Sequence, residues 1–241
     1  MTALTDVTAL RSIELVGVDG DDTLWHCQRS FDEATERFAE IVRPWVEGDV
    51  DVALALDDAE RRNLAVFGFG VKAFTLSMIE AATDVGGDRI PAAALMRLVE
   101  LAKEMMLEPI ELLPEVQAGL AALAEDHRLA LVTKGDLLHQ RRKLADSGLE
   151  IYFDHVEVVP DKSAVIYADF LERRRIEPAQ FVMIGDSVRS DVLPVLAIGG
   201  RAVHVRPQHQ WGHEHAHHDG SVPTVDTFGA VPGAVERLVS P

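Results

Sequence analysis

The sequence predicts an α/β protein in which a parallel sheet core carries an inserted all-helical domain. Short apolar runs rich in Val and Ile occur in both parts of the core, and helical patterns separate them, which is typical of βαβ units. Between about residues 30 and 112 helical periodicity replaces the strand pattern. We therefore expect the core over residues 1–29 and 113–241 and the insert over residues 30–112.

Six segments of the core are expected to be strands, because each is a short apolar run next to turn residues or charges. They are Ile13–Val18, Arg128–Val132, Phe181–Ile184 and Ala202–Val205, with the weaker His155–Val159 and Thr224–Thr227. Helices are expected at Pro114–Glu125, Asp136–Ser147, Ser163–Arg174, Ser187–Ile198 and Val231–Leu238. Pro194 should disturb the fourth of these helices, since proline lacks a backbone N–H.

The insert is expected to hold four helices separated by Pro and Gly turns. They are Phe31–Val46, Asp51–Asn63, Val71–Asp84 and Ile90–Leu107. With about 80 residues, the insert is large enough to form a small domain. Its acidic runs, Asp49–Asp51 and Asp57–Glu60, are expected to be solvated helix faces.

Composition excludes several classes of protein. The 241 residues carry a formal net charge of −17, which argues against non-specific binding to nucleic acid or to an anionic membrane. No apolar stretch approaches the roughly 18 to 20 residues that span a bilayer, and residues 1–11 lack a signal-peptide pattern. The single cysteine, Cys27, excludes an internal disulfide. We therefore expect a cytoplasmic protein with no nucleic-acid or membrane partner.

Two strands are each followed by a pair of carboxylates. Asp19 and Asp21 follow the first strand, and Asp186 follows the third, with Asp191 five residues later. The carboxyl ends of parallel strands open into the crevice where ligands bind. Four carboxylates placed together would be costly without a cation, and Mg²⁺ prefers oxygen ligands. The two pairs together predict a magnesium site, although the first pair alone could be an ordinary surface turn.

A further strand ends in Thr133-Lys134-Gly135, just before an expected helix. A hydroxyl and backbone N–H groups near a helix N-terminus suit a phosphate, so these three residues are candidates for substrate binding. Taken alone, a plain helix-initiating turn is the more common interpretation. The same holds for Lys162, whose functional interpretation depends on the other motifs.

Four motifs resemble, in order and spacing, those of the haloacid dehalogenase superfamily: Asp19-x-Asp21-x-Thr23, Thr133, Lys162, and Gly185-Asp186-x₄-Asp191. The resemblance covers about Ile13 to Val205. It implies a Rossmann-like core, and the insert resembles the family's all-helical cap domain of the C1 type. It also implies a hydrolase that uses Mg²⁺.

The resemblance implies a role for each carboxylate of the first motif. Asp19 would be the nucleophile that forms an aspartyl phosphate, and Asp21 would be the general acid and then the general base. Asp19 and the backbone carbonyl of Asp21 would also bind Mg²⁺. Family dehalogenases and phosphonate-cleaving members lack a carboxylate at position 21, so Asp21 favours a phosphate ester. Asp22 replaces the glycine that is frequent there, and its Cβ restricts the turn.

The other motifs would complete the site. Thr133 would hold a phosphate oxygen, and Lys162 would offset charge on Asp19 and the phosphoryl group. Asp186 would bind Mg²⁺ directly, and Asp191 would act through water or by orienting Lys162. Mg²⁺ and Lys162 leave one of four carboxylate charges uncompensated, and a protonated Asp21 would remove it.

The function that follows is a magnesium-dependent phosphatase for a small phosphorylated metabolite. Sugar phosphates, nucleotides, glycolate-type and amino-acid phosphates all remain open, because the cap sets leaving-group preference. A phosphomutase is the alternative within the family. A phospho-accepting receiver domain or an inactive scaffold is the alternative outside enzymes, but a receiver phosphorylates an Asp after its third strand and lacks such an insert.

Three further features are of lower rank. The loop Phe67-Gly68-Phe69-Gly70-Val71-Lys72 could face the site and place Lys72 at the substrate, or it could be an ordinary turn between helices. The cluster His209–His218 could bind a transition metal, but a solvated loop is favoured. A cap of this size could also pair with a second copy, which makes a homodimer one expectation.

Overall fold

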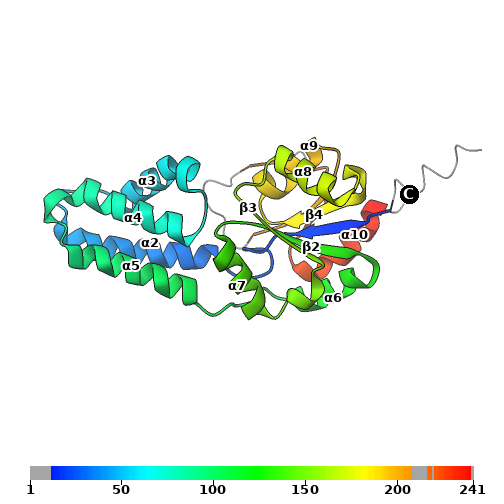
Figure 1. Ribbon diagram of the computed structural model, residues 1–241, viewed down its shortest axis with the longest axis horizontal. Coiled ribbons are helices and arrows are strands. Elements are labelled where there is room, and N and C mark those ends of the chain that lie inside the picture. Colours follow the sequence, from blue (N-terminus) through cyan, green and yellow to red (C-terminus); the bar gives the residue numbers. More distant parts are fainter. Residues whose placement is uncertain (1–11, 208–215, 219, 240–241) are drawn as a thin grey trace, which may run out of the picture.

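The computed structural model describes residues 12–207, 216–218 and 220–239. It confirms the α/β fold with a helical insertion. Figure 1 shows the sheet and its flanking helices on one side and the helices α2–α5 on the other. From here on we call these two parts the core and the cap.

The sheet of the core has, among the described residues, six parallel strands in the order β3-β2-β1-β4-β5-β6. They are β1 (Leu15–Val18), β2 (Arg128–Lys134), β3 (His155–Val159), β4 (Phe181–Gly185), β5 (Arg201–Val205) and β6 (Thr224–Val225). Each of the six expected segments is thus confirmed as a strand. The order is that of a Rossmann-like sheet, and it reverses beside β1, where the carboxyl ends of β2, β1 and β4 are neighbours.

The central strand is buried on both faces. Leu15 packs with Tyr167 and Phe170 of α8 (Ala164–Arg174), whereas Val16 packs in a separate cluster with side chains of α6 (Val116–Asp126) and α10 (Val231–Val239). The alternation follows the two-residue period of a strand. Helices on both faces explain why β1 and β4 are continuous apolar runs. The remaining helix, α7 (Leu137–Ser147), follows β2.

The segment after β4 differs from the single helix expected over Ser187–Ile198. The chain forms one π-helical turn over Val188–Val192 and then the short helix α9 (Leu193–Ala197). Pro194 lies in the first turn of α9, where a backbone N–H has no partner within the helix in any case. Proline therefore starts a new helix here instead of bending an existing one.

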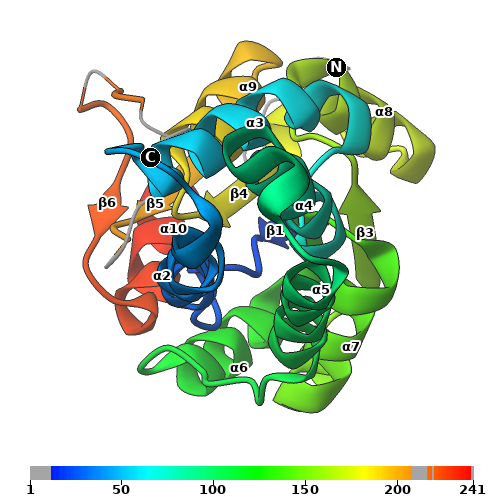
Figure 2. The ribbon, with the colours of Figure 1, turned by 90° about the vertical axis from the view of Figure 1, so that its left-hand side faces the viewer.

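The cap consists of α2 (Gln28–Val42), α3 (Val52–Phe67), α4 (Val71–Gly86) and α5 (Ala92–Leu107). These helices pack around a hydrophobic cluster of their own, which includes Phe38, Leu56, Met78 and Leu98. Figure 2 views the molecule from the cap, with α2–α5 in front of β1. No helix in the described part of the chain is both long and apolar enough to cross a membrane.

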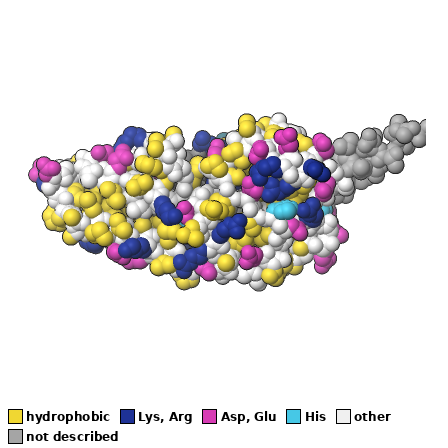
Figure 3. Space-filling model, in the orientation of Figure 1, with side chains coloured by type: hydrophobic (Ala, Val, Ile, Leu, Met, Phe, Trp, Pro, Cys, Tyr) yellow, Lys and Arg dark blue, Asp and Glu magenta, His cyan; other side chains and the backbone are white. Residues whose placement is uncertain are grey.

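Hydrophobic side chains are also exposed on the cap surface, where they are frequent in Figure 3. Val66 is 73% exposed, and Leu54, Leu76 and Met96 are exposed as well. Such side chains are common on soluble proteins, and a large contiguous group of them often marks a contact with another molecule. Pairing of two caps remains a prediction.

The histidine cluster lies largely outside the described residues, which leaves out His209, His213 and His215. His218 is described, and its two ring nitrogens lie 3.1 Å from the backbone N of Gly220 and 3.3 Å from the hydroxyl oxygen of Thr224. Binding of a transition metal by this cluster therefore stays a prediction from the sequence.

Candidate active site

The carboxyl ends of the three central strands bring the predicted residues together. Asp19 follows β1, Thr133 lies near the end of β2, and Asp186 follows β4. These residues border a cavity of about 290 Å³ that is lined by both the core and the cap. The predicted residues that line it are Asp19, Asp21, Thr133, Lys134, Lys162, Asp186 and Asp191.

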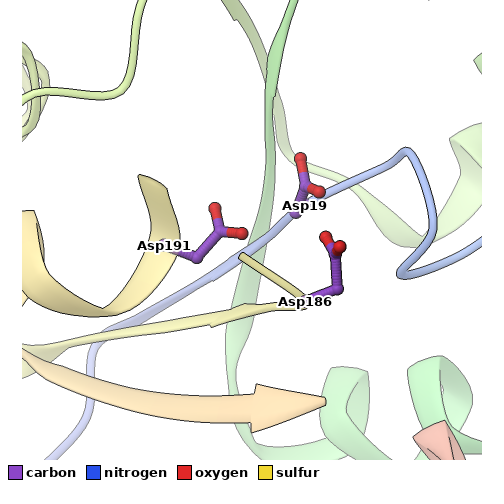
Figure 4. Close-up of side chains that lie close together, drawn as sticks. All are labelled: Asp19, Asp186 and Asp191. Atoms are coloured by element: carbon purple, nitrogen blue, oxygen red, sulfur yellow. The ribbon is translucent and has the colours of Figure 1, made fainter. Parts of the chain in front are cut away.

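Three carboxylates form a cluster at this end of the sheet. Oxygens of Asp19, Asp186 and Asp191 lie within 4.8 Å of one another, and Figure 4 shows the side chains around a common space. Burial raises the pKa of Asp19 to about 6. Burial, followed by the charge of Asp19, raises the pKa of Asp186 well above its ordinary value. Such a set of hard oxygen donors fits a magnesium ion, whose charge would offset the repulsion.

Lys162 joins two members of this cluster. Its Nζ contacts Asp19 Oδ1 and lies 2.6 Å from Asp191 Oδ1. Burial disfavours the ammonium form, but the charges of Asp19 and Asp191 raise the pKa of Lys162 well above its usual value. The other oxygen of Asp191 accepts a hydrogen bond of 3.1 Å from the backbone N of Ser187. Asp191 thus contacts Lys162 directly, as the second of the two roles expected for it requires.

Two small residues let the acids approach each other. A Cβ on Gly185 would lie 2.2 Å from Asp191 Oδ2, so this position requires glycine. Thr23 is fully buried, and its hydroxyl oxygen lies 3.3 Å from Asp186 Oδ1 and 3.5 Å from Asp19 Oδ2. The same oxygen accepts a 3.0 Å hydrogen bond from the backbone N of Asp186. Thr23 therefore fixes the relative position of the two acids, a role that the sequence did not assign.

Asp21 belongs to a separate network. Its Oδ1 contacts Nζ of Lys143 and accepts a 2.6 Å hydrogen bond from Trp25 Nε1, and its Oδ2 accepts a 2.8 Å bond from Gln140 Nε2. Burial alone would raise the pKa of Asp21, but the charge of Lys143 and the three hydrogen bonds lower it to about 2. Asp21 is therefore ionised in this state, in contrast to the protonated form expected from charge balance. Lys143 supplies the compensating charge.

Sequence reasoning missed Lys143 and Gln140. Both lie on α7, which begins directly after the turn at Gly135, and positions three apart in a helix share one face. Asp136 caps this helix by accepting a 3.0 Å bond from the backbone N of His139. The start of this helix was predicted. Its polar face, which carries Gln140 and Lys143, was the feature of the sequence that could have indicated a contact with the first motif.

The turn after β2 lies against both the core and the cap. Thr133 is buried, and Nζ of Lys134 donates a 2.9 Å hydrogen bond to the hydroxyl of Ser190. The same ammonium lies 4.2 Å from the ring centre of Phe69 in the cap. Gly135 has a φ of +119°, which favours glycine, and it does not itself line the cavity. The end of β2 thus places a hydroxyl and an ammonium beside the acidic cluster.

The glycine loop between α3 and α4 faces the site. Gly68, Phe69 and Gly70 line the cavity, and a Cβ on Gly70 would lie 3.2 Å from the backbone N of Asp136. Lys72 points elsewhere: its Nζ lies 2.8 Å from Asp136 Oδ2, its side chain is 57% exposed, and it is not part of the cavity lining. The loop is therefore at the site, while Lys72 ties the cap to the core beside it.

Asp22 occupies the left-handed region with a φ of +57°. Aspartate tolerates this conformation better than most residues, because its short side chain can form local hydrogen bonds. Its carboxylate accepts hydrogen bonds from the backbone N of Cys27 at 2.9 Å and of Gln28 at 3.0 Å. The side chain that replaces the expected glycine thus holds the start of α2, the first helix of the cap.

Comparisons with known proteins agree with this geometry. A family model described as haloacid dehalogenase-like hydrolase matches residues 13–199. Among curated proteins, the N-acylneuraminate-9-phosphatase of Homo sapiens is 32% identical over 107 residues, and the enzyme of Rattus norvegicus is 29% identical over 105 residues. Each match covers 42% of this chain and 42% of the relative. The matched part is therefore less than half the length of these relatives.

Solved structures cover far more of the chain. A haloacid dehalogenase-like family hydrolase from Xanthomonas campestris is 38% identical, with a TM-score of 0.85, and the match covers 94% of this chain and 92% of that one. A 2-haloacid dehalogenase from Pseudomonas syringae is 22% identical, with a TM-score of 0.65 and coverage of 93% and 99%. The second of these similarities shows a shared fold.

Proposed function

Because the chain belongs to the haloacid dehalogenase-like hydrolase family, we propose that it is a magnesium-dependent phosphoric monoester hydrolase. The substrate is a small phosphorylated metabolite, and the reaction passes through an aspartyl phosphate on Asp19. One observation carries this proposal: two carboxylates of a single turn contact two different buried lysines, Asp19 with Lys162 and Asp21 with Lys143. The two carboxylates are thereby suited to different tasks.

In the first half-reaction an oxygen of Asp19 attacks phosphorus, and the bond from phosphorus to the leaving oxygen breaks. The leaving oxygen takes a proton from Asp21, which first gains that proton from solvent or from the arriving phosphate monoanion. Lys143 keeps Asp21 ionised before substrate binds. The negative charge of an arriving phosphate raises the pKa of a neighbouring carboxyl group and so favours the protonated form.

In the second half-reaction water attacks the same phosphorus, and Asp21, now ionised, accepts a proton from that water. The bond between phosphorus and Asp19 breaks, so the free carboxylate and inorganic phosphate are regenerated. Lys143, Gln140 and Trp25 hold the carboxylate of Asp21 in place through both transfers. Three donors on one carboxylate limit its rotation, which keeps the proton-exchanging oxygens in position.

The phosphoryl group itself would be bound by the turn after β2. The hydroxyl of Thr133 and the ammonium of Lys134 come from the end of β2, and the backbone N–H of Gly135 comes from the turn itself. Lys162 approaches from the loop between β3 and α8. Mg²⁺ held by Asp19, Asp186 and the backbone carbonyl of Asp21 would neutralise charge on the phosphoryl oxygens.

The charges of the site support this assignment. From the sequence, four carboxylate charges were set against the charges of Mg²⁺ and Lys162, so one negative charge was left uncompensated before substrate binds. Lys143 compensates that charge while Asp21 remains ionised. A site balanced in this way accepts a phosphate dianion at a lower electrostatic cost than the arrangement first expected.

The proposal is tested by phosphate release from a panel of phosphorylated metabolites with Mg²⁺ or with EDTA. We expect release that needs the metal and is lost in Asp19→Asn. The exposed Asp58 of α3 provides a matched control, Asp58→Asn, which should keep full activity. Isomer formation without free phosphate would point to a phosphomutase, and halide release from haloacids to a dehalogenase; either result would contradict the proposal.

A further inference from the structure

The lining of the catalytic cavity, among the described residues, has side chains of both charges on the core side and acidic ones alone on the cap side. Its basic side chains, Lys134, His139, Lys143 and Lys162, all come from the core. The cap contributes the carboxylates of Asp32, Asp57 and Glu60 and, in the described lining, no basic side chain. The run Asp57–Glu60 is therefore only in part the solvated helix face expected from the sequence. Asp58 is exposed, but Asp57 and Glu60 border the cavity.

Glu60 is the carboxylate without a partner. It is partly buried, and no described residue forms an ion pair or hydrogen bond with it. Burial, followed by the charge of Asp57, raises the pKa of Glu60 to about 7. Asp57 differs, because Arg61 lies 2.6 Å from it. A desolvated and unpaired carboxylate is destabilising, and a cation in the cavity would compensate it.

A second acceptor in the cavity also lacks a donor. Gln140 is 4% exposed and lines the cavity, and its Oε1 has no hydrogen-bond partner among the described residues. The orientation of the amide is fixed, since Nε2 donates to Asp21 Oδ2 at 2.8 Å and to the backbone O of Lys134 at 2.6 Å. Buried acceptors are rarely left unpaired, so we expect this oxygen, beside Asp21, to accept a hydrogen bond from a ligand or a water molecule.

Aromatic rings complete the cap end of the cavity. Phe31 and Phe74 both line it, and their ring centroids lie 5.2 Å apart in an edge-to-face arrangement. Phe69 also lines the cavity, but its ring already lies 4.2 Å from the ammonium of Lys134. Aromatic faces next to carboxylates favour a cationic group over an anionic one, because the faces carry partial negative charge.

We propose that the leaving group of the substrate carries an ammonium group, which Glu60 and Asp57 bind at the cap end of the cavity. The substrate class is a phosphate monoester of an amino alcohol or an amino sugar. This inference rests on the proposed function, which places the phosphate at the core end. A leaving group with a carboxylate would be repelled by the cap end, so glycolate-type and sugar-acid phosphates are poor substrates.

The test compares amine-bearing substrates with partners in which a hydroxyl or an acetamide group replaces the ammonium group. Glucosamine 6-phosphate is measured against N-acetylglucosamine 6-phosphate and glucose 6-phosphate, and 2-aminoethyl phosphate against 2-hydroxyethyl phosphate, in an amine-free buffer near pH 8. In at least one series we expect kcat/KM for the amine to exceed that of its neutral partners by about tenfold or more, as for a desolvated charged hydrogen bond. Equal or lower values for the amine in both series would overturn the inference.

Glu60→Gln should remove this preference, because the amide carries no charge to compensate an ammonium group. Glu36→Gln, an exposed glutamate on α2 outside the cavity lining, is the matched control and should keep the preference. A preference that survives Glu60→Gln would contradict the assignment. A response to KCl would also contradict the assignment. If added KCl raised turnover of a neutral substrate in the wild type but not in Glu60→Gln, a free inorganic cation would occupy the site.

Failure of the inference and failure of the proposed function can be told apart. Hydrolysis of p-nitrophenyl phosphate that depends on Asp19, without any preference for amines, would overturn the inference alone. Calorimetry on Asp19→Asn is independent of turnover: we expect 2-aminoethyl phosphate to bind more tightly than 2-hydroxyethyl phosphate, and equal affinity would overturn the inference. N-acetylneuraminate 9-phosphate as the best substrate of the panel would do so as well, since its leaving group is anionic.

Discussion

The two ends of the catalytic cavity are built differently. At the core end, Asp19 and Asp21 each contact a buried lysine, Lys162 or Lys143, so each of these two carboxylates has a countercharge before substrate arrives. At the cap end, Glu60 has no partner among the described residues. The difference teaches which part of a substrate each end serves. Under the proposed function, the core end is preorganised for the phosphoryl group of the substrate, and the cap end is completed by the ligand itself.

The largest effect is expected from breaking a pair at the core end. Lys162→Met leaves Asp19 and Asp191 buried next to each other without their shared cation. We expect the free energy of unfolding to fall by about 3–5 kcal/mol, as for other broken buried pairs. Phosphate release should fall at least about 10³-fold. Chemical denaturation and initial rates check this, with Lys103→Met, an exposed lysine paired with Glu100, as control. Full stability in Lys162→Met would show that the pair is not structurally important.

The next effect concerns the second pair at the core end. In the free enzyme Lys143 helps to lower the pKa of Asp21 to about 2. Lys143→Met should therefore raise the pKa of Asp21. The carboxylate of the variant then becomes protonated at a higher pH than that of the wild type. Asp21 acts in its protonated form in the first half-reaction, so we expect the basic limb of the pH profile of kcat/KM to move upward and the maximal rate to fall about 10²-fold. An unchanged profile would contradict the role of Lys143 on Asp21.

The cap end should respond with the opposite sign. Burial and Asp57 raise the pKa of Glu60 to about 7 from an ordinary value of 4.5, so ionised Glu60 destabilises the fold. For such a raised pKa, stability is fully present below pH 4.5 and is lost as pH rises through about 7. Glu60→Gln should match the wild type near pH 4.5 and melt at a higher temperature at pH 8. A lower melting temperature at pH 8 would indicate a partner that Glu60 loses in the variant.

The smallest effect is expected where cap and core meet at the surface. Lys72 pairs with Asp136, but its side chain is 57% exposed and solvent weakens the pair. Although the sequence suggested Lys72 as a substrate contact, its position predicts that Lys72→Ala changes KM and kcat by less than about threefold. Michaelis–Menten measurements on the best substrate decide between the two. A tenfold rise in KM would restore Lys72 as a substrate residue.

The core end was largely predictable from sequence because its information is local. Asp19 and Asp186 each follow an apolar strand directly, and Thr133 ends another. Once the strands are known to be parallel neighbours, these residues must meet. The π-helical turn at Val188–Val192 was not predictable in the same way, since a single helix with a disturbing Pro194 satisfied the same pattern.

The remaining residues depend on how helices are rotated and packed. Lys143 and Gln140 are two polar residues in a helix with many, and only the docking of α7 shows that they face Asp21. Glu60 lies in an acidic run that the sequence most simply predicts to be a solvated helix face. The packing of the cap against the core places Glu60 at the cavity instead. Both cases are tertiary effects that no short motif encodes.

The most direct test of the central claim is mass spectrometry of protein that is acid-quenched during turnover of its best substrate with Mg²⁺. We predict a phosphoryl adduct on the peptide that contains Asp19, formed at a rate at least equal to turnover and absent from Asp19→Asn. Phosphate release at full rate with no adduct, or with the adduct on a different residue, would contradict the assignment of Asp19 as the nucleophile.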